Sequence, residues 1–151
     1  MKKILLMCVL SLSLWANSVY TVTYDEDIAE VEASILESFK DVGLVVVWKL
    51  DILEEFKKKG LDKKFGEKFN TAGLSGVRTI VACNGKFGND IINADSTMMA
   101  FCPIRVTLTE KDGKTTVLYV RPSVGPKESK AHPILVKLEK KVINAIESGM
   151  K

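Results

Sequence analysis

An Asp-Gly turn between two β-branched segments constrains the fold of this chain most strongly. Residues 103–109 and 115–121 flank the segment Glu110 to Lys114, which contains Asp112-Gly113. Asp-Gly between alternating apolar residues is the strongest short-range signal for a β-hairpin. The chain is therefore expected to contain at least one antiparallel pair of strands.

Segments of helix and strand pattern alternate along the rest of the chain. Asp27-x-x-Glu30 and Asp51-x-x-Glu54 have the spacing of capping boxes, which mark the beginning of helices. The pattern predicts a two-layer α+β fold in the order β-α-β-α-β-α-β-β-α, with helices packed on a mostly antiparallel sheet. The remaining strands are expected at residues 19–24, 44–50 and 78–83, and the helices at residues 27–43, 51–60, 86–94 and 133–146.

Residues 44–50 form a continuous apolar run that is rich in valine. A run without alternation is typical of a strand that is buried on both faces. We therefore expect Trp48, which lies within this run, to belong to the hydrophobic core.

The N-terminus has the three parts of a secretory signal peptide. Lys2 and Lys3 precede the apolar residues 4–14, and Ala16-Asn17-Ser18 supplies small residues for cleavage. The apolar run is shorter than the roughly 20 residues that a transmembrane helix needs. We predict a signal peptide at residues 1–18, cleaved after Ala16 or Ser18, a single domain at residues 19–148, and a periplasmic location.

The net charge gives little support to a nucleic-acid partner. The formal charge of the chain is +3, and removal of Lys2 and Lys3 lowers it from +3 to +1. Nucleic-acid binding usually requires a clustered basic surface, whereas many lysines here alternate with acidic residues. We expect neither nucleic-acid binding nor, after cleavage, membrane association.

The segment Leu61 to Val77 interrupts the alternation of helices and strands. It contains Gly66 and Gly73 and is expected to be a long loop with a short amphipathic turn around Phe65 and Phe69. Long loops in compact domains are often binding loops or lids. A surface insertion without function is the alternative.

The sulfur-containing residues Cys83, Met98, Met99 and Cys102 are the candidate metal ligands. Thiolates and thioethers bind soft metals such as Cu(I), and methionine also serves as an axial haem ligand. Met98 and Cys102 approach each other only if their segment is helical, and Pro103 favours an extended segment that separates them. Methionine also commonly fills gaps in a core, so no cofactor is predicted and copper or haem remains an alternative.

Cys83 and Cys102 are also candidates for a disulfide, because they form a pair once the signal peptide is removed. A disulfide requires Cα atoms within about 7 Å of each other. Antiparallel strands bring the two cysteines to the same end of the sheet, whereas a parallel crossover separates them. Two unpaired core thiols are the third possibility.

The sequence contains no complete catalytic motif. His132 is the only histidine, and Gly73-Leu74-Ser75-Gly76-Val77 lacks the last glycine of a nucleophile elbow. The sequence therefore does not decide whether the chain is an enzyme, and the absence of a complete catalytic motif favours a protein without enzymatic activity.

Four stretches match the pattern of a known family: Val81-Ala82-Cys83-Asn84, Phe101 to Val106, Glu110 to Gly113 and Arg121-Pro122. Through these stretches the chain, from about Val19 to Ile146, resembles the bacterial domain-of-unknown-function family 302. Gly85 stands where the family often has proline, and Cys102 falls one place before Pro103 instead of after it. The resemblance implies an α+β fold and homodimers, and it implies no established activity.

We interpret the chain as an exported binding or accessory module that holds a small apolar ligand or a periplasmic protein between its sheet and the loop 61–77. A redox, soft-metal or haem accessory protein that uses the four sulfur residues is the first alternative. A structural partner in an envelope complex is the second. The candidate ligand-binding residues are Phe65, Phe69, Cys83, Asn84 and Cys102.

Overall fold

The computed structural model describes residues 18–150. The predicted signal peptide, apart from Ser18, lies outside the described residues. Within residues 18–150, no helix has the length and apolar character needed to cross a membrane.

The core element is a five-stranded antiparallel sheet in the order β1-β5-β4-β3-β2. The predicted α+β class and order of elements are confirmed. Asp112 and Gly113 both have positive φ angles, 52° and 72°, and they connect β4 to β5 as the hairpin signal predicts. The strands are β1 (Val19–Tyr24), β2 (Val45–Asp51), β3 (Gly76–Cys83), β4 (Ile104–Lys111) and β5 (Lys114–Val120).

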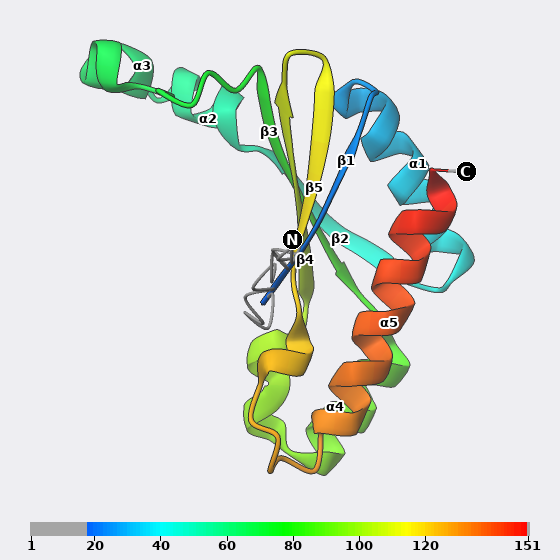
Figure 1. The fold of residues 1–151 in the computed structure, drawn as a ribbon. Helices are drawn as coiled ribbons and strands as arrows, with labels where there is room; N and C mark the ends of the chain where they lie inside the picture. Colours follow the sequence, from blue (N-terminus) through cyan, green and yellow to red (C-terminus); the bar gives the residue numbers. More distant parts are fainter. Residues whose placement is uncertain (1–17, 151) are drawn as a thin grey trace, which may run out of the picture.

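The two long helices, α1 (Ile28–Asp41) and α5 (His132–Gly149), lie side by side on one face of the sheet (Figure 1). The Asp27 side chain accepts hydrogen bonds from the backbone N–H groups of Ala29 and Glu30, which fixes the beginning of α1. Both helices bury an apolar stripe against the sheet. The residues at the centre of this core include Val31, Ile35, Phe39, Val106, Leu108, Val117, Leu135, Leu138 and Val142.

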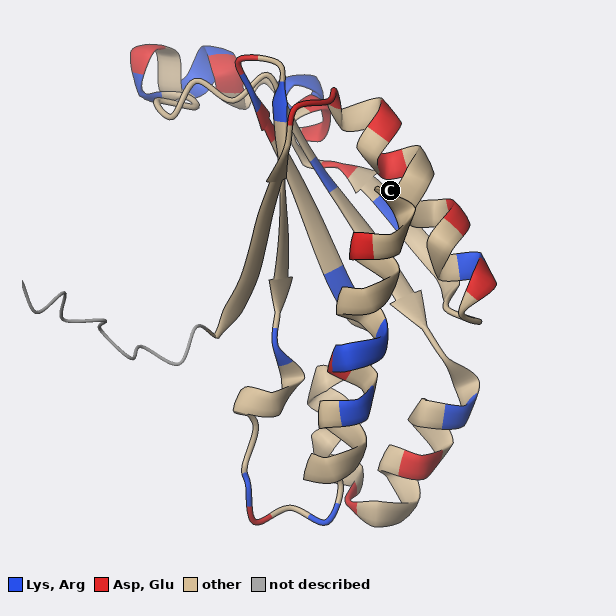
Figure 2. Ribbon diagram, turned by 45° about the vertical axis from the view of Figure 1, so that its right-hand side comes forward, with Lys and Arg blue, Asp and Glu red and all other residues tan. Residues whose placement is uncertain are grey.

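The remaining helices lie at the two ends of the sheet (Figure 1). One end carries α4 (Gly85–Ala94) and the short 3-10 helices η2 (Ser96–Phe101) and η3 (Pro122–Val124). The other end carries α2 (Ile52–Lys58), α3 (Leu61–Phe65) and η1 (Gly66–Lys68), which project away from the sheet. We call residues 52–68 the arm. Figure 2 shows charged residues of both signs on the helices and the arm, whereas the middle of the sheet carries few.

The expectation that residues 44–50 form a buried strand is wrong. β2 is an edge strand that pairs only with β3, and a register shift between Val46 and Trp48 interrupts that pairing. Val45, Val47 and Trp48 are 64%, 58% and 54% exposed. Trp48 pairs with Val81, which pairs with Arg105, so Trp48 belongs to the row of side chains on the face of the sheet that α1 and α5 leave uncovered. Trp48 therefore lies at the surface and not in the core.

Two expectations about irregular segments also need correction. The predicted loop 61–77 begins with α3 and η1, and its last two residues already belong to β3. The segment before Pro103, which was expected to be extended, contains η2, and the backbone becomes extended only at Cys102. The helices in both segments have fewer than seven residues, and helices of this length give little periodic signal in a sequence.

Candidate functional site

The two cysteines meet at the end of the sheet that carries α4 and η2. Cys83 is the last residue of β3, and Cys102 lies between η2 and β4. The antiparallel pairing of Ala82 with Ile104 places the end of β3 beside the start of β4. The two Sγ atoms are 3.6 Å apart, and both residues carry free thiols in the structure.

The two thiols have different surroundings. Cys102 is buried with 7% of its surface exposed, whereas Cys83 is half-buried. Burial raises the pKa of Cys102 to about 11, and the hydrogen bond and charge interaction with Cys83 act in the same direction. Cys102 therefore stays protonated at neutral pH.

The other candidate ligand residues near the thiols, Met98, Met99 and Asn84, pack in the core or hydrogen-bond to the backbone. Met98 in η2 is buried in the core, and Met99 is partly buried against it. The Asn84 side chain accepts a hydrogen bond from the Phe87 N–H at the start of α4 and donates one to the Gly43 carbonyl. Asn84 thus caps a helix and joins two chain segments. Within residues 18–150, no group of three or more His, Cys, Asp or Glu side chains is arranged to hold a metal ion.

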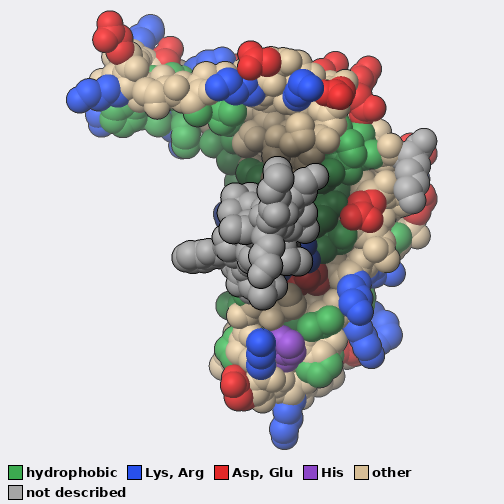
Figure 3. All heavy atoms as spheres, viewed as in Figure 1, with side chains coloured by type: hydrophobic (Ala, Val, Ile, Leu, Met, Phe, Trp, Pro, Cys, Tyr) green, Lys and Arg blue, Asp and Glu red, His purple; other side chains and the backbone are tan. Residues whose placement is uncertain are grey.

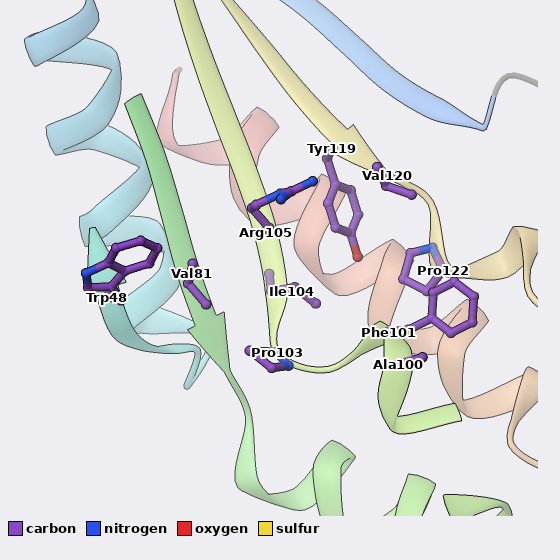
Figure 4. A pocket seen from close by; sticks show the side chains of 10 residues that line it. All are labelled: Trp48, Val81, Ala100, Phe101, Pro103, Ile104, Arg105, Tyr119, Val120 and Pro122. Atoms are coloured by element: carbon purple, nitrogen blue, oxygen red, sulfur yellow. The ribbon is translucent and has the colours of Figure 1, made fainter. Parts of the chain in front are cut away.

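An open cavity of about 500 Å³ lies next to the thiol end of the sheet (Figure 4). Arg105 is the only charged side chain in its lining and makes no ion pair with another residue of the described chain. The buried hydroxyl of Tyr119 has no hydrogen-bond partner within residues 18–150. We call this the sheet-end cavity; its lining consists of Trp48, Val81, Ala100, Phe101, Pro103, Ile104, Arg105, Tyr119, Val120 and Pro122.

A second cavity, of about 440 Å³, lies under the arm at the opposite end of the sheet. Figure 3 shows hydrophobic side chains along the underside of the projecting arm. Phe56 and Phe65 are 44% and 50% exposed there. We call this the arm cavity; its lining consists of Ile52, Leu53, Phe56, Leu61, Phe65, Lys68, Phe69, Asn70, Leu74 and Val77.

Asn70 fixes the conformation of residues 70–74, which line part of the arm cavity. Its side chain donates a hydrogen bond to the Leu74 carbonyl and accepts one from the Leu74 N–H. Its own φ angle is +48°, a conformation that asparagine adopts more readily than most residues. The segment after η1 is thereby folded into a closed turn that presents Phe69 and Leu74 to the cavity.

The structure thus divides the predicted site into two parts. Phe65 and Phe69 come together in the arm cavity, while Cys83, Asn84 and Cys102 lie at the other end of the sheet. The expected cavity between sheet and loop is instead bounded mainly by α2 and the segment 61–74, and β3 contributes only Val77. Sequence analysis missed Leu53 and Phe56, although their i, i+3 spacing in α2 marks one face of a helix.

Comparisons with known proteins agree with the fold. The family model described as "Domain of unknown function DUF302" matches residues 20–149. A crystal structure of an uncharacterized conserved DUF302 protein from Bacillus stearothermophilus is similar, with a TM-score of 0.76 and 21% sequence identity over 89% of this chain and 99% of that chain. No curated protein matches the sequence. Because the family model spans most of the chain, the protein belongs to the DUF302 family.

Proposed function

We propose that this DUF302 protein is an exported binding module that holds an apolar ligand in the arm cavity. The apolar lining of that cavity is the observation that carries the proposal. Ligand sites are typically concave, mostly apolar and about 300–1,000 Å³ in volume, and the arm cavity is about 440 Å³. Three phenylalanines supply the lining with large, rigid contact surfaces.

The ligand suited to this lining is an alkyl chain or an aromatic ring. Lys68 is the only charged side chain in the lining, so an acidic group on such a ligand has a cation within the same cavity. The partial exposure of Phe56 and Phe65 leaves apolar surface for the ligand to cover. Export is supported by Lys2, Lys3 and the apolar segment that follows them.

We also propose that the protein is a homodimer. The family resemblance implies dimers, and β2 offers an edge strand with exposed Val45 and Val47. Unpaired edge strands readily add a strand from another chain.

An apolar fluorescent probe tests the binding proposal. We expect N-phenyl-1-naphthylamine to bind the purified protein with a rise in fluorescence, and Phe65→Ser to weaken this binding about tenfold. Ten-fold corresponds to about 1.4 kcal/mol, which is the scale of a partly buried aromatic contact. Because Phe65 is 50% exposed, this substitution is expected to leave the fold intact.

Ile92→Ser is the matched control. Ile92 is 53% exposed on α4 and lines neither the sheet-end cavity nor the arm cavity. Its substitution is therefore expected to leave probe binding unchanged. Equal binding by the wild type and Phe65→Ser would contradict the proposal. So would equal weakening by both substitutions, because the probe would then report general surface hydrophobicity.

A further inference from the structure

We propose that Cys83 and Cys102 form a reversible dithiol–disulfide site that exchanges electrons with a disulfide-bonded peptide or protein. In this site Cys83 is the attacking cysteine and Cys102 is the resolving cysteine. The proposal goes beyond ligand binding in the arm cavity and does not depend on it, because the thiols lie at the opposite end of the sheet.

The first argument is the position of the two sulfur atoms. Two independent features bring them to 3.6 Å. The pairing of β3 with β4 aligns Ala82 with Ile104, and the Cys102 N–H donates a hydrogen bond to the Met99 carbonyl at the end of η2. Sulfur atoms in a disulfide lie about 2.0 Å apart, so bond formation needs an approach of only about 1.5 Å.

The second argument is the difference in access between the two thiols. Cys102 is 7% exposed and lies in the core cluster, whereas Cys83 is half-buried at the end of its strand. A bulky disulfide partner therefore reaches Cys83 first. Val45, which pairs with Cys83 on the edge strand β2, is 64% exposed and leaves this corner of the sheet open.

The third argument is the sheet-end cavity beside the pair. Val81 precedes Cys83 by two residues on β3, and Pro103 follows Cys102; both residues line this cavity. Its other walls include Trp48 and Phe101, which Figure 4 shows on either side of it. The cavity therefore offers space, at the thiol end of the sheet, for the apolar side chains that flank the disulfide of a partner.

The exchange consists of two balanced steps. Cys83 loses its proton, and its thiolate attacks one sulfur of the partner R–S–S–R′. A mixed disulfide Cys83–S–S–R forms, and R′–S⁻ leaves and takes up a proton. Cys102 then loses its proton and attacks the Cys83 sulfur, which releases R–S⁻ to be protonated. The protein dithiol is oxidised by two electrons, and the partner disulfide is reduced to two thiols.

The first step also prepares the second. Burial is the largest cause of the raised pKa of Cys102, and the Cys83 sulfur contributes the remaining causes through its hydrogen bond and, as a thiolate, through its negative charge. These contributions disappear once the Cys83 sulfur is bonded to the partner. Cys102 then deprotonates more easily, next to the sulfur that it attacks.

The test uses an aryl disulfide, 5,5′-dithiobis(2-nitrobenzoate), on the reduced full chain with the substitution Cys8→Ser, which leaves Cys83 and Cys102 as its two thiols. This background serves as the wild type of the test. We expect the folded wild type to release two thionitrobenzoate ions and to retain no probe group, with a Cys83–Cys102 bond found by non-reducing peptide mapping. We expect Cys102→Ser to release one ion and to retain one probe group on Cys83. Cys83→Ser is expected to react about tenfold more slowly or worse, because its remaining thiol is buried and protonated.

Denatured protein provides the control, since both single variants should then react at the same rate. A folded wild type that retains two probe groups would overturn the proposal, and so would equal rates for the two folded variants. Stoichiometric Cu(I) binding that blocks the probe and is weakened by Met98→Leu would overturn it in favour of a metal site.

Discussion

Glu139 is a buried carboxylate whose interactions link α5 to the end of β5. Its side chain is 10% exposed, and its two oxygens accept hydrogen bonds from Arg121 Nη1 at 2.9 Å and from the Ser123 N–H at 3.0 Å. Burial alone would raise the pKa of Glu139, but the hydrogen bonds from Ser123 and Arg121 outweigh it and hold the pKa below 4.5. The ionised form is therefore the one that stabilises the fold.

We expect Glu139→Gln to lower the free energy of unfolding by about 1.5–3 kcal/mol at pH 7, because it removes a charged hydrogen-bond acceptor from a buried site. Since the pKa is lowered by folding, this stabilisation is present above about pH 4.5 and is lost as the pH falls through the folded pKa. Urea unfolding between pH 3 and pH 7 measures the difference in the free energy of unfolding between the wild type and Glu139→Gln.

Glu37→Gln, at an exposed position of α1, is the control and should change the free energy of unfolding by less than about 0.5 kcal/mol. If the effect of Glu139→Gln did not depend on pH, the stabilisation by ionised Glu139 would be contradicted.

Single residues also show what a sequence reveals and what it hides. Cys83 and Cys102 were recognisable as a candidate pair, but only the antiparallel register of β3 and β4 decides that they meet. Arg105 and Tyr119 gave no sequence signal, because each looks like an ordinary strand residue. Their common place in the sheet-end cavity arises from strands whose contacts are distant in the sequence.

At the scale of elements, the positions of the strands and long helices along the chain were predictable, whereas the order in which the strands pair in the sheet was not. β-branched runs and capping boxes mark individual segments locally, whereas strand order depends on the whole fold. The apolar run of β2 therefore looked like a central strand, although β2 lies at the edge. Of the arm, α2 was predicted and α3 was not. Gly60 and Gly66 bound α3, so that it has only five residues and gives little periodic signal.

The exposed edge of β2 leads to the prediction for the homodimer. We expect light scattering at micromolar concentration to give about twice the monomer mass for the wild type. Val47→Lys is expected to give a monomer, because a lysine at an exposed edge opposes pairing with another strand; Val47 is 58% exposed. Val124→Lys, at a residue 48% exposed in η3, is the control and should remain dimeric. A wild type that is monomeric throughout this range would rule out the dimer.

At the scale of the whole molecule, export is the prediction that decides where the protein works. We expect the protein from a periplasmic fraction to begin at Asn17 or Val19, because signal peptidase cleaves after small residues. N-terminal sequencing or intact-mass measurement identifies the first residue. Substitution of Lys2 and Lys3 by glutamate should retain the uncleaved chain in the cell, whereas the same change at Lys63 and Lys64 should leave export unaffected. Periplasmic protein that still carries Met1 would contradict cleavage.

The position of β3 has a consequence for how this protein can diversify. Val77 lines the arm cavity near the start of the strand, and Cys83 contributes to the thiol pair at its end. The distance between them is about 20 Å at the usual rise of a β-strand. A single stiff strand therefore acts as a spacer that keeps the two regions apart. Substitutions more than about 10 Å apart usually act independently of each other. We therefore expect changes in the arm cavity and changes at the thiol pair to be separable within one small domain.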